Sequence, residues 1–117
     1  MAIRKREVYG TTVLDVGGEY YGGKETDALD RAIANEIALG NLRIVLNLSQ
    51  CRMMNSTAFG VLIGAHKVVE AMGGMITLCG AERRMKRLLA VLRVHELFDH
   101  YPTEDEALEA LGPRATA

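Results

Sequence analysis

The stretch LRIVLNLSQCRMMNSTAFGVLIGAHKVVEAMGGMITLCG, residues 42–80, contains two short apolar runs separated by a longer segment. The runs LRIVLNL and MITLC include β-branched residues and are typical of buried strands, whereas apolar residues recur at helical spacing in the segment between them. This order predicts two parallel strands joined by a right-handed helical crossover. The rest of the chain is expected to build an α/β fold around this unit.

The predicted helix has apolar residues three and four positions apart, which places them in one stripe that packs on the sheet. Its other side is expected to carry Phe59, Gly60, Ile63, Lys67 and Glu70. Two large apolar residues beside a glycine predict a docking surface there, although cover by a loop or by the chain termini explains them equally well. The stripe consists of Ala58, Val61, Leu62, Ala65, Val68, Val69 and Met72.

Asn55, Ser56 and Thr57 stand where the first strand has ended and this helix begins. Backbone N–H groups in the first turn of a helix have no partner within the helix and favour anions. Hydroxyl groups at this point therefore predict a site for a negatively charged group. The alternative is that the three residues only cap the helix, because capping favours the same residue types.

The chain resembles the anti-sigma factor antagonists of the STAS domain family over nearly its whole length. The residues that carry the resemblance are IVLNLS, MMNSTAFGVLIGAHKVVEAMGG and ITLCGAERRMKRLLAVLRVHELFDHYPTEDEAL. They follow the family order of strand, D-S-S-G-hydrophobic-G loop, helix, Gly-Gly break, strand ending near Cys-Gly, and Arg-rich helix. The resemblance implies a single STAS-like domain over residues 1–117, with a mixed sheet of four to five strands and about four helices packed mainly on one side.

The resemblance also implies a function without catalysis. The unphosphorylated domain would bind an anti-sigma factor that is a serine/threonine kinase, and so release the sigma factor. Phosphorylation would end this binding, and a protein phosphatase would restore it. By position the phosphoacceptor is Thr57, with Ser56 as the second choice, and the partner surface would include Asn55, Phe59, Gly60, Ile63 and Lys67.

The loop departs from the family pattern at three positions. Asn55 stands in place of Asp, Thr57 in place of the accepting Ser, and Ala58 in place of Gly, whereas Ser56 and Gly60 match. An acidic neighbour is lost, and a methyl group is added beside the accepting oxygen. STAS-like domains also occur as unphosphorylated interaction subunits of lipid-transport or signalling complexes, and the loss of Asp slightly favours this alternative.

Amino-acid composition and net charge indicate which kinds of partner to expect. The chain has 117 residues, 49% of them hydrophobic, which suits one domain with a single core. Fourteen basic and fifteen acidic residues give a net charge of −1, so neither nucleic acid nor a membrane surface is an expected partner. MAIRKREVYG is not followed by an apolar segment of the export type, and the expected location is the cytoplasm.

The flanking segments complete the predicted fold. Residues 3–9 and 11–16 predict a hairpin around Gly10, and residues 26–39 and 82–93 predict helices. Residues 97–101 predict a short last strand. A final helix is expected from Thr103, which forms a capping box with Glu106, to about Leu111, followed by a frayed tail at 113–117.

Several enzymatic or redox functions are disfavoured, and no cofactor or metal is expected. Residues 18–24 fit the phosphate-loop pattern G-x-x-x-x-G-K, but Glu25 replaces the Ser or Thr that would hold magnesium. The three histidines are too scattered for a metal motif, and His66 is too far along the helix to act as a base for Ser56. Cys51 and Cys79 are expected near the ends of parallel strands as apolar packing residues.

Overall fold

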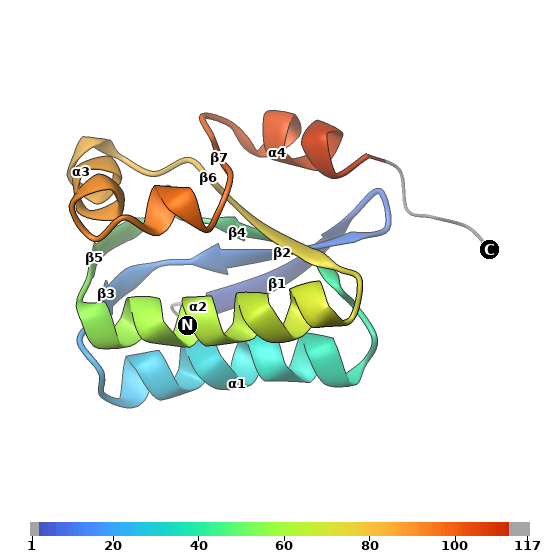
Figure 1. Ribbon diagram of the computed structural model, residues 1–117, viewed down its shortest axis with the longest axis horizontal. Helices are drawn as coiled ribbons and strands as arrows, with labels where there is room; N and C mark the ends of the chain where they lie inside the picture. The colour runs from blue at the N-terminus through green and yellow to red at the C-terminus, as the bar shows by residue number, and fades with distance from the viewer. Residues whose placement is uncertain (1–2, 113–117) are drawn as a thin grey trace.

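The computed structural model describes residues 3–112 of the chain (Figure 1). Within this part the strands are β1 (Ile3–Val8), β2 (Thr11–Val16), β3 (Gly18–Tyr20), β4 (Arg43–Asn47), β5 (Cys51–Met54), β6 (Met75–Cys79) and β7 (His100–Tyr101). The helices are α1 (Lys24–Ala38), α2 (Ser56–Ala71), α3 (Arg83–Val91) and α4 (Glu104–Leu111), with a 3-10 helix, η1 (Val94–Glu96), before β7. The α/β class predicted from the sequence is confirmed.

Five strands form the main sheet in the order β1-β2-β4-β6-β7. β1 is antiparallel to β2, which confirms the hairpin, and the other neighbouring strands are parallel. β4 and β6 pair from Arg43 with Met75 to Asn47 with Cys79, and α2 connects them. The strand–helix–strand unit predicted at residues 42–80 therefore lies in the middle of the sheet.

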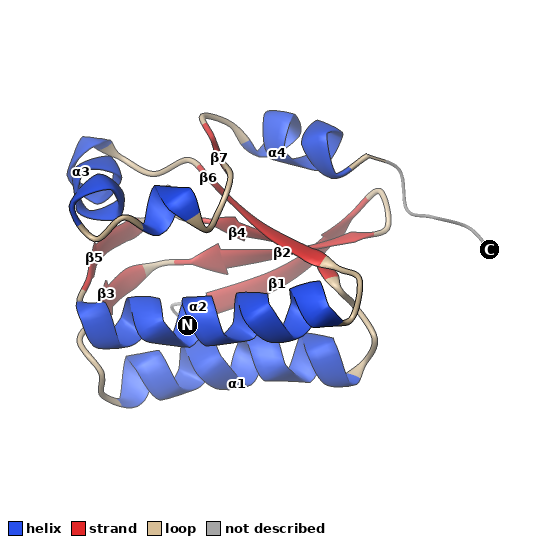
Figure 2. Ribbon diagram, in the orientation of Figure 1, coloured by secondary structure: helices blue, strands red, loops and turns tan. Residues whose placement is uncertain are grey.

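The two faces of the sheet bury different helices (Figure 2). Leu14, Leu46 and Leu78 belong to the larger core, together with residues of α1, α2 and α3. Their neighbours Val13, Val45 and Cys79 belong to a smaller core with Ala107, Leu108 and Leu111 of α4. This division follows from the alternation of side chains along a strand. The prediction of four helices packed mainly on one side of a mixed sheet is confirmed.

Two short strands, β3 and β5, pair in a separate parallel sheet that the sequence does not predict. Neither Gly18–Tyr20 nor Cys51–Met54 is long enough to show a clear alternation of apolar and polar residues. Their pairing also joins segments far apart in the chain, which a local pattern cannot reveal. The small sheet continues through the hydrogen bond from the Asn55 N–H to the Tyr20 carbonyl, at 3.0 Å, and thereby fixes the start of α2.

Other boundaries differ slightly from those expected. α1 begins at Lys24 rather than at residue 26, and α3 ends at Val91. Arg93 has a φ of 59°, in the left-handed region that a helix cannot contain, so the chain turns there into η1. The last strand is limited to His100–Tyr101 rather than 97–101, because Leu97 and Phe98 lie in the turn that follows η1 and both donate their N–H groups to the Val94 carbonyl.

Helix α4 is capped as predicted and is tied to the sheet at both ends. The Thr103 hydroxyl accepts a hydrogen bond from the Glu106 N–H at 3.2 Å. The Glu104 carboxylate accepts hydrogen bonds from the Arg6 guanidinium and from Asn47 Nδ2. At the other end, Arg43 Nη2 donates to the Gly112 carbonyl at 2.7 Å. The tail expected at 113–117 lies outside the described residues.

Candidate functional site at the start of α2

Asn55 alone forms the side-chain cap of α2. Its backbone is extended, with φ −90° and ψ 178°, and its side-chain oxygen accepts a hydrogen bond from the Ala58 N–H at 3.0 Å. Its carbonyl accepts the first helical hydrogen bond, from the Phe59 N–H at 3.1 Å. The predicted capping role therefore belongs to Asn55, and the hydroxyl groups of Ser56 and Thr57 are not the cap.

Ser56 and Thr57 are the first two helical residues, and both are exposed. The backbone N–H groups at these two positions precede the first carbonyl–amide bond of α2 and so have no partner within the helix. The positive end of the helix dipole lies at the same point. A hydroxyl that became phosphorylated here would stand beside free N–H donors and a favourable local field. The structure thus confirms that both residues stand at the helix start, and the anion site itself stays a prediction.

The loop before α1 passes close to Thr57. Gly22 has a φ of 93°, and a Cβ built on it would lie 3.3 Å from Thr57 Cγ2. The Gly22 N–H donates to Thr26 Oγ1 at 2.8 Å, which holds the loop against its own helix. The first turns of α1 and α2 consequently lie at the same end of the molecule (Figure 1). A Cβ at position 22 would press against the Thr57 side chain, and the positive φ favours glycine there.

The predicted partner surface needs one correction. Phe59 is only 2% exposed and belongs to the larger core, so its placement on the outer side of the helix is wrong. Ile63 is half-buried and also packs on that core. Gly60 and Lys67 are exposed as expected.

Two residues of the predicted core stripe are exposed. Val68 is 49% exposed and Met72 is 53% exposed, so the expectation that they pack on the sheet is wrong. The buried face of α2 is instead rotated around the helix axis toward Phe59. Its fully buried members are Ala58, Phe59, Leu62 and Val69.

The segment that resembles a phosphate loop does not form one continuous loop. Gly18–Tyr20 is the strand β3, and Lys24 is already the first residue of α1. The Tyr20 side chain is buried, and its hydroxyl donates to the Gly17 carbonyl at 2.6 Å. Burial raises the pKa of this phenol to about 12. The backbone of Gly18–Tyr20 pairs with β5 in a sheet, so it does not wrap around a phosphate.

Both cysteines are buried free thiols. Cys79 ends β6, as expected, but Cys51 begins β5, and the two belong to different cores. Burial raises the pKa of Cys51 to about 11 and that of Cys79 to about 12. A thiol with a raised pKa is a poor nucleophile at neutral pH. This agrees with the packing role inferred from the sequence.

Neither a metal centre nor a membrane helix is found in the described part of the chain. Among residues 3–112, no three His, Cys, Asp or Glu side chains are grouped so that they could hold a metal ion. No helix in this range is both long enough and apolar enough to cross a membrane.

Comparison with known proteins agrees with this fold. The model of the STAS domain family matches residues 2–107. A TM1081 homologue from Thermotoga neapolitana is 31% identical over 75 residues, which are 64% of this chain and 66% of the relative. The anti-sigma F factor antagonist of Paenibacillus polymyxa is 31% identical over 68 residues, which are 58% of each chain. The matched segments span less than two thirds of either relative.

Solved structures show the same fold. The crystal structure of TM1081 from Thermotoga maritima has a TM-score of 0.85 at 21% identity and covers 93% of both chains. The phosphorylated form of the Bacillus protein SpoIIAA has a TM-score of 0.70 at 21% identity, covering 93% of this chain and 98% of that one.

The fold, the site at the start of α2 and the family match define one class of protein: this chain belongs to the STAS domain family. The resemblance seen in the sequence is thereby confirmed. Among the known relatives are proteins named as anti-sigma factor antagonists.

Proposed function

We propose that this chain is an anti-sigma factor antagonist that acts in the cytoplasm as a phosphorylation switch. In its unphosphorylated form it binds an anti-sigma factor that is also a serine/threonine kinase, and the sigma factor is released. Phosphorylation at Thr57, or at Ser56 as the second choice, ends this binding. The observation that carries the proposal is the pair of exposed hydroxyl residues in the first turn of α2, in a chain of this family.

The chain acts by binding, and it is a substrate of the reactions that switch it. The partner kinase transfers the phosphoryl group, and a protein phosphatase removes it. The chain's own part in both reactions is to present the accepting hydroxyl.

Electrostatics explains how a phosphate would switch binding without unfolding the domain. Phosphorylation adds roughly −1.5 to −2 charges at neutral pH. Beside the free N–H groups at the start of α2, that charge is tolerated in the free protein. In an interface, however, the same charge must lose water and meet groups arranged around a neutral hydroxyl, which is unfavourable by several kcal/mol unless a cation pairs with it.

The partner surface follows from the exposed side of α2. Thr57, Gly60 and Lys67 are exposed along this side, with Asn55 at its start. Gly60 and Gly64 have open space where a Cβ would stand, so a partner backbone can approach the helix closely at these points. Val68, which is 49% exposed, adds apolar area, and half-buried Ile63 lies at the margin. Phe59 is excluded from the surface by its burial.

A phosphorylation assay with site mapping tests this function. The chain is incubated with ATP and an anti-sigma factor kinase encoded near its gene, and the modified residue is located by mass spectrometry. We expect one phosphate, on Thr57, that is absent from Thr57→Ala and retained by Ser56→Ala. The reverse pattern would move the acceptor to Ser56.

The assay also separates the switch from the second candidate function, an unphosphorylated interaction subunit of a lipid-transport or signalling complex. Asn55 favours this candidate because it supplies an amide where the family has an acid. If the kinase bound the chain but transferred no phosphate to it or to either variant, the switch would be wrong and the second candidate would stand. The melting temperatures of both variants serve as the control for folding.

A further inference from the structure

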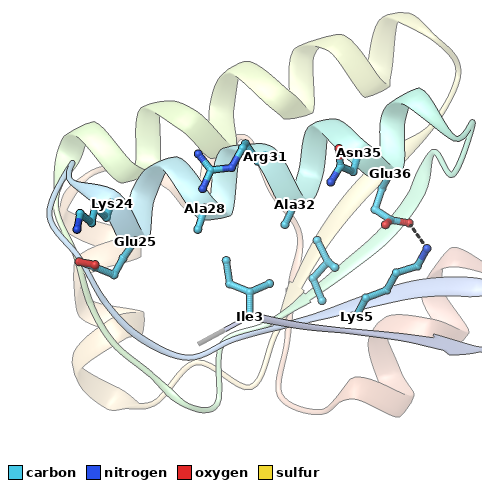
Figure 3. Close-up of a pocket in the computed structure, with 10 residues that line it drawn as sticks. Ile3, Lys5, Lys24, Glu25, Ala28, Arg31, Ala32, Asn35 and Glu36 are labelled. Carbon is cyan, nitrogen blue, oxygen red and sulfur yellow. Dashed lines mark ion pairs between the residues drawn. The ribbon is translucent and has the colours of Figure 1, made fainter. Parts of the chain in front are cut away.

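A groove runs between β1, the first strand of the main sheet, and helix α1, and neither Ser56 nor Thr57 lines it. It has a volume of about 650 Å³. Ile3 and Lys5 of β1 form its floor, and side chains of α1 form its roof (Figure 3). Leu14 of β2 also lines the groove. The helix contributes two small residues, Ala28 and Ala32, above Ile3, and their size leaves the middle of the groove open (Figure 3).

The backbone of β1 is available on the side of this groove. β1 is the terminal strand of the main sheet, and among the described strands it pairs only with β2. In an antiparallel pair every second residue directs its N–H and C=O groups away from its partner. These outward groups can pair with another extended chain. The groove is thus bounded by a row of unused backbone donors and acceptors.

Charged side chains on exposed edge strands commonly prevent such pairing. In β1, most of the charged side chains do not line the groove. Arg4 and Arg6 form ion pairs with Asp15, and Arg6 also contacts Glu104 of α4 on the far face of the sheet. Only Lys5 of the charged residues in β1 lines the groove, and its Nζ lies 3.1 Å from Glu36 Oε1. This pair is drawn at one end of the groove in Figure 3.

The remaining charges around the groove favour an acidic ligand. Since Lys5 and Glu36 neutralise each other, the charged lining that is left consists of Lys24, Arg31 and Glu25. Two cations and one anion leave a local charge of +1. Lys24 and Glu25 lie at the end of the groove opposite the Lys5–Glu36 pair, and Arg31 extends from the helix between them (Figure 3).

We propose that this groove binds an extended, acidic peptide segment of a partner protein as an additional strand beside β1. Ile3–Val8 spans roughly 20 Å at 3.3 Å per residue, enough for about six residues of peptide. Every second side chain of the peptide is apolar and lies over Ile3, between Ala28 and Ala32. An acidic side chain or the terminal carboxylate of the peptide pairs with Lys24 or Arg31. The site does not involve Thr57 and stands whether or not Thr57 is phosphorylated.

Selection from a random octapeptide library displayed on phage, with the full chain as the target, tests this proposal. Enriched peptides should alternate apolar and polar residues and carry at least one acid. A synthetic copy of an enriched peptide should slow hydrogen exchange of the outward amides of β1.

Ala32→Phe fills the groove and should weaken binding of this peptide by about tenfold or more. Ala34→Phe makes the same change at an exposed position of α1 outside the groove and should have no effect.

Charge reversal provides a second test in case Ala32→Phe disturbs folding. Arg31 is exposed, so Arg31→Glu should leave the melting temperature unchanged and shift the selected peptides from acidic to basic. The proposal is overturned if no family of peptides is enriched, or if bound peptides protect no amide of β1. It is equally overturned if sodium decanoate, an acyl-chain probe, perturbs the β1 and α1 amides whereas no peptide does.

Discussion

Phe59 shows how one residue can be assigned to the wrong side of a helix. Large apolar residues occur around most of α2, so spacing alone admits more than one buried stripe. The helix packs on α1 as well as on the sheet, so a stripe inferred for the sheet alone does not define its buried face. The structure buries Phe59 and exposes Val68 and Met72. Thr57, by contrast, was placed correctly, because a helix start depends on local capping chemistry.

Truncation of Phe59 distinguishes a core residue from a docking residue. We expect Phe59→Ala to lower the free energy of unfolding by about 3–5 kcal/mol, because a buried aromatic ring is lost and a cavity remains. Val68→Ala, at an exposed position of the same helix, should change it by less than about 0.5 kcal/mol. Urea denaturation measures both values. If both variants lost an equally small amount of unfolding free energy, the assignment of Phe59 to the core would be wrong.

At the scale of elements, the long periodic segments were predictable and the short ones were not. β4, α2 and β6 each have a clear apolar pattern, and the Gly-Gly break marks the end of α2. β3 and β5 have no such pattern, because their stability comes from pairing with each other and from the core beneath them. These two strands set the position of Asn55. The strands that hold the candidate site in place could therefore not be predicted from the sequence.

The glycines of the central unit have opposite structural roles. A Cβ on Gly74 would lie 2.2 Å from the Leu42 carbonyl oxygen and 2.5 Å from Leu42 Cβ, so the turn before β6 has no space for a side chain. Gly64, within α2, has open space around its Cα. Gly74 is therefore required by packing between β4 and β6, whereas no packing within the domain requires glycine at position 64.

Alanine at these two positions should change stability in opposite directions. We expect Gly64→Ala to stabilise the chain by about 0.5–1 kcal/mol, because alanine is the better helix former. Gly74→Ala should destabilise it, because backbone atoms must move apart. Thermal denaturation of both variants under identical conditions makes the comparison. A neutral or stabilising Gly74→Ala would show that this turn is looser than the structure indicates.

At the scale of the whole molecule, one ionic cluster joins the two ends of the chain. Arg6 of β1 pairs with Asp15 of β2 and with Glu104 at the start of α4. Hydrogen bonding to Arg6 lowers the pKa of Asp15 and of Glu104 below their ordinary values. Carboxylates with lowered pKa values in the folded state stabilise it above their unfolded pKa values, of about 4, and this contribution is lost as the pH falls through the folded values.

The melting temperature should follow this cluster as the pH is lowered. It should stay nearly level from pH 7 to about pH 5, and then fall below about pH 4 as Asp15 and Glu104 take up protons. Glu104→Gln removes one of these groups, so we expect a lower melting temperature at pH 7 and a shallower fall in acid. Glu109→Gln, at an exposed site on the same helix, should follow the parent curve. Identical curves for all three proteins would contradict the role of the cluster.

Calorimetric titration of the chain with its anti-sigma factor kinase tests the central claim, that charge at the start of α2 controls partner binding. The parent and Thr57→Ala should bind with similar affinity. Thr57→Glu should keep a native melting curve and lose binding by about a hundredfold or more, since a buried unpaired charge costs several kcal/mol. If Thr57→Glu and Ser56→Glu both bound as tightly as the parent, the start of α2 would not be the switch.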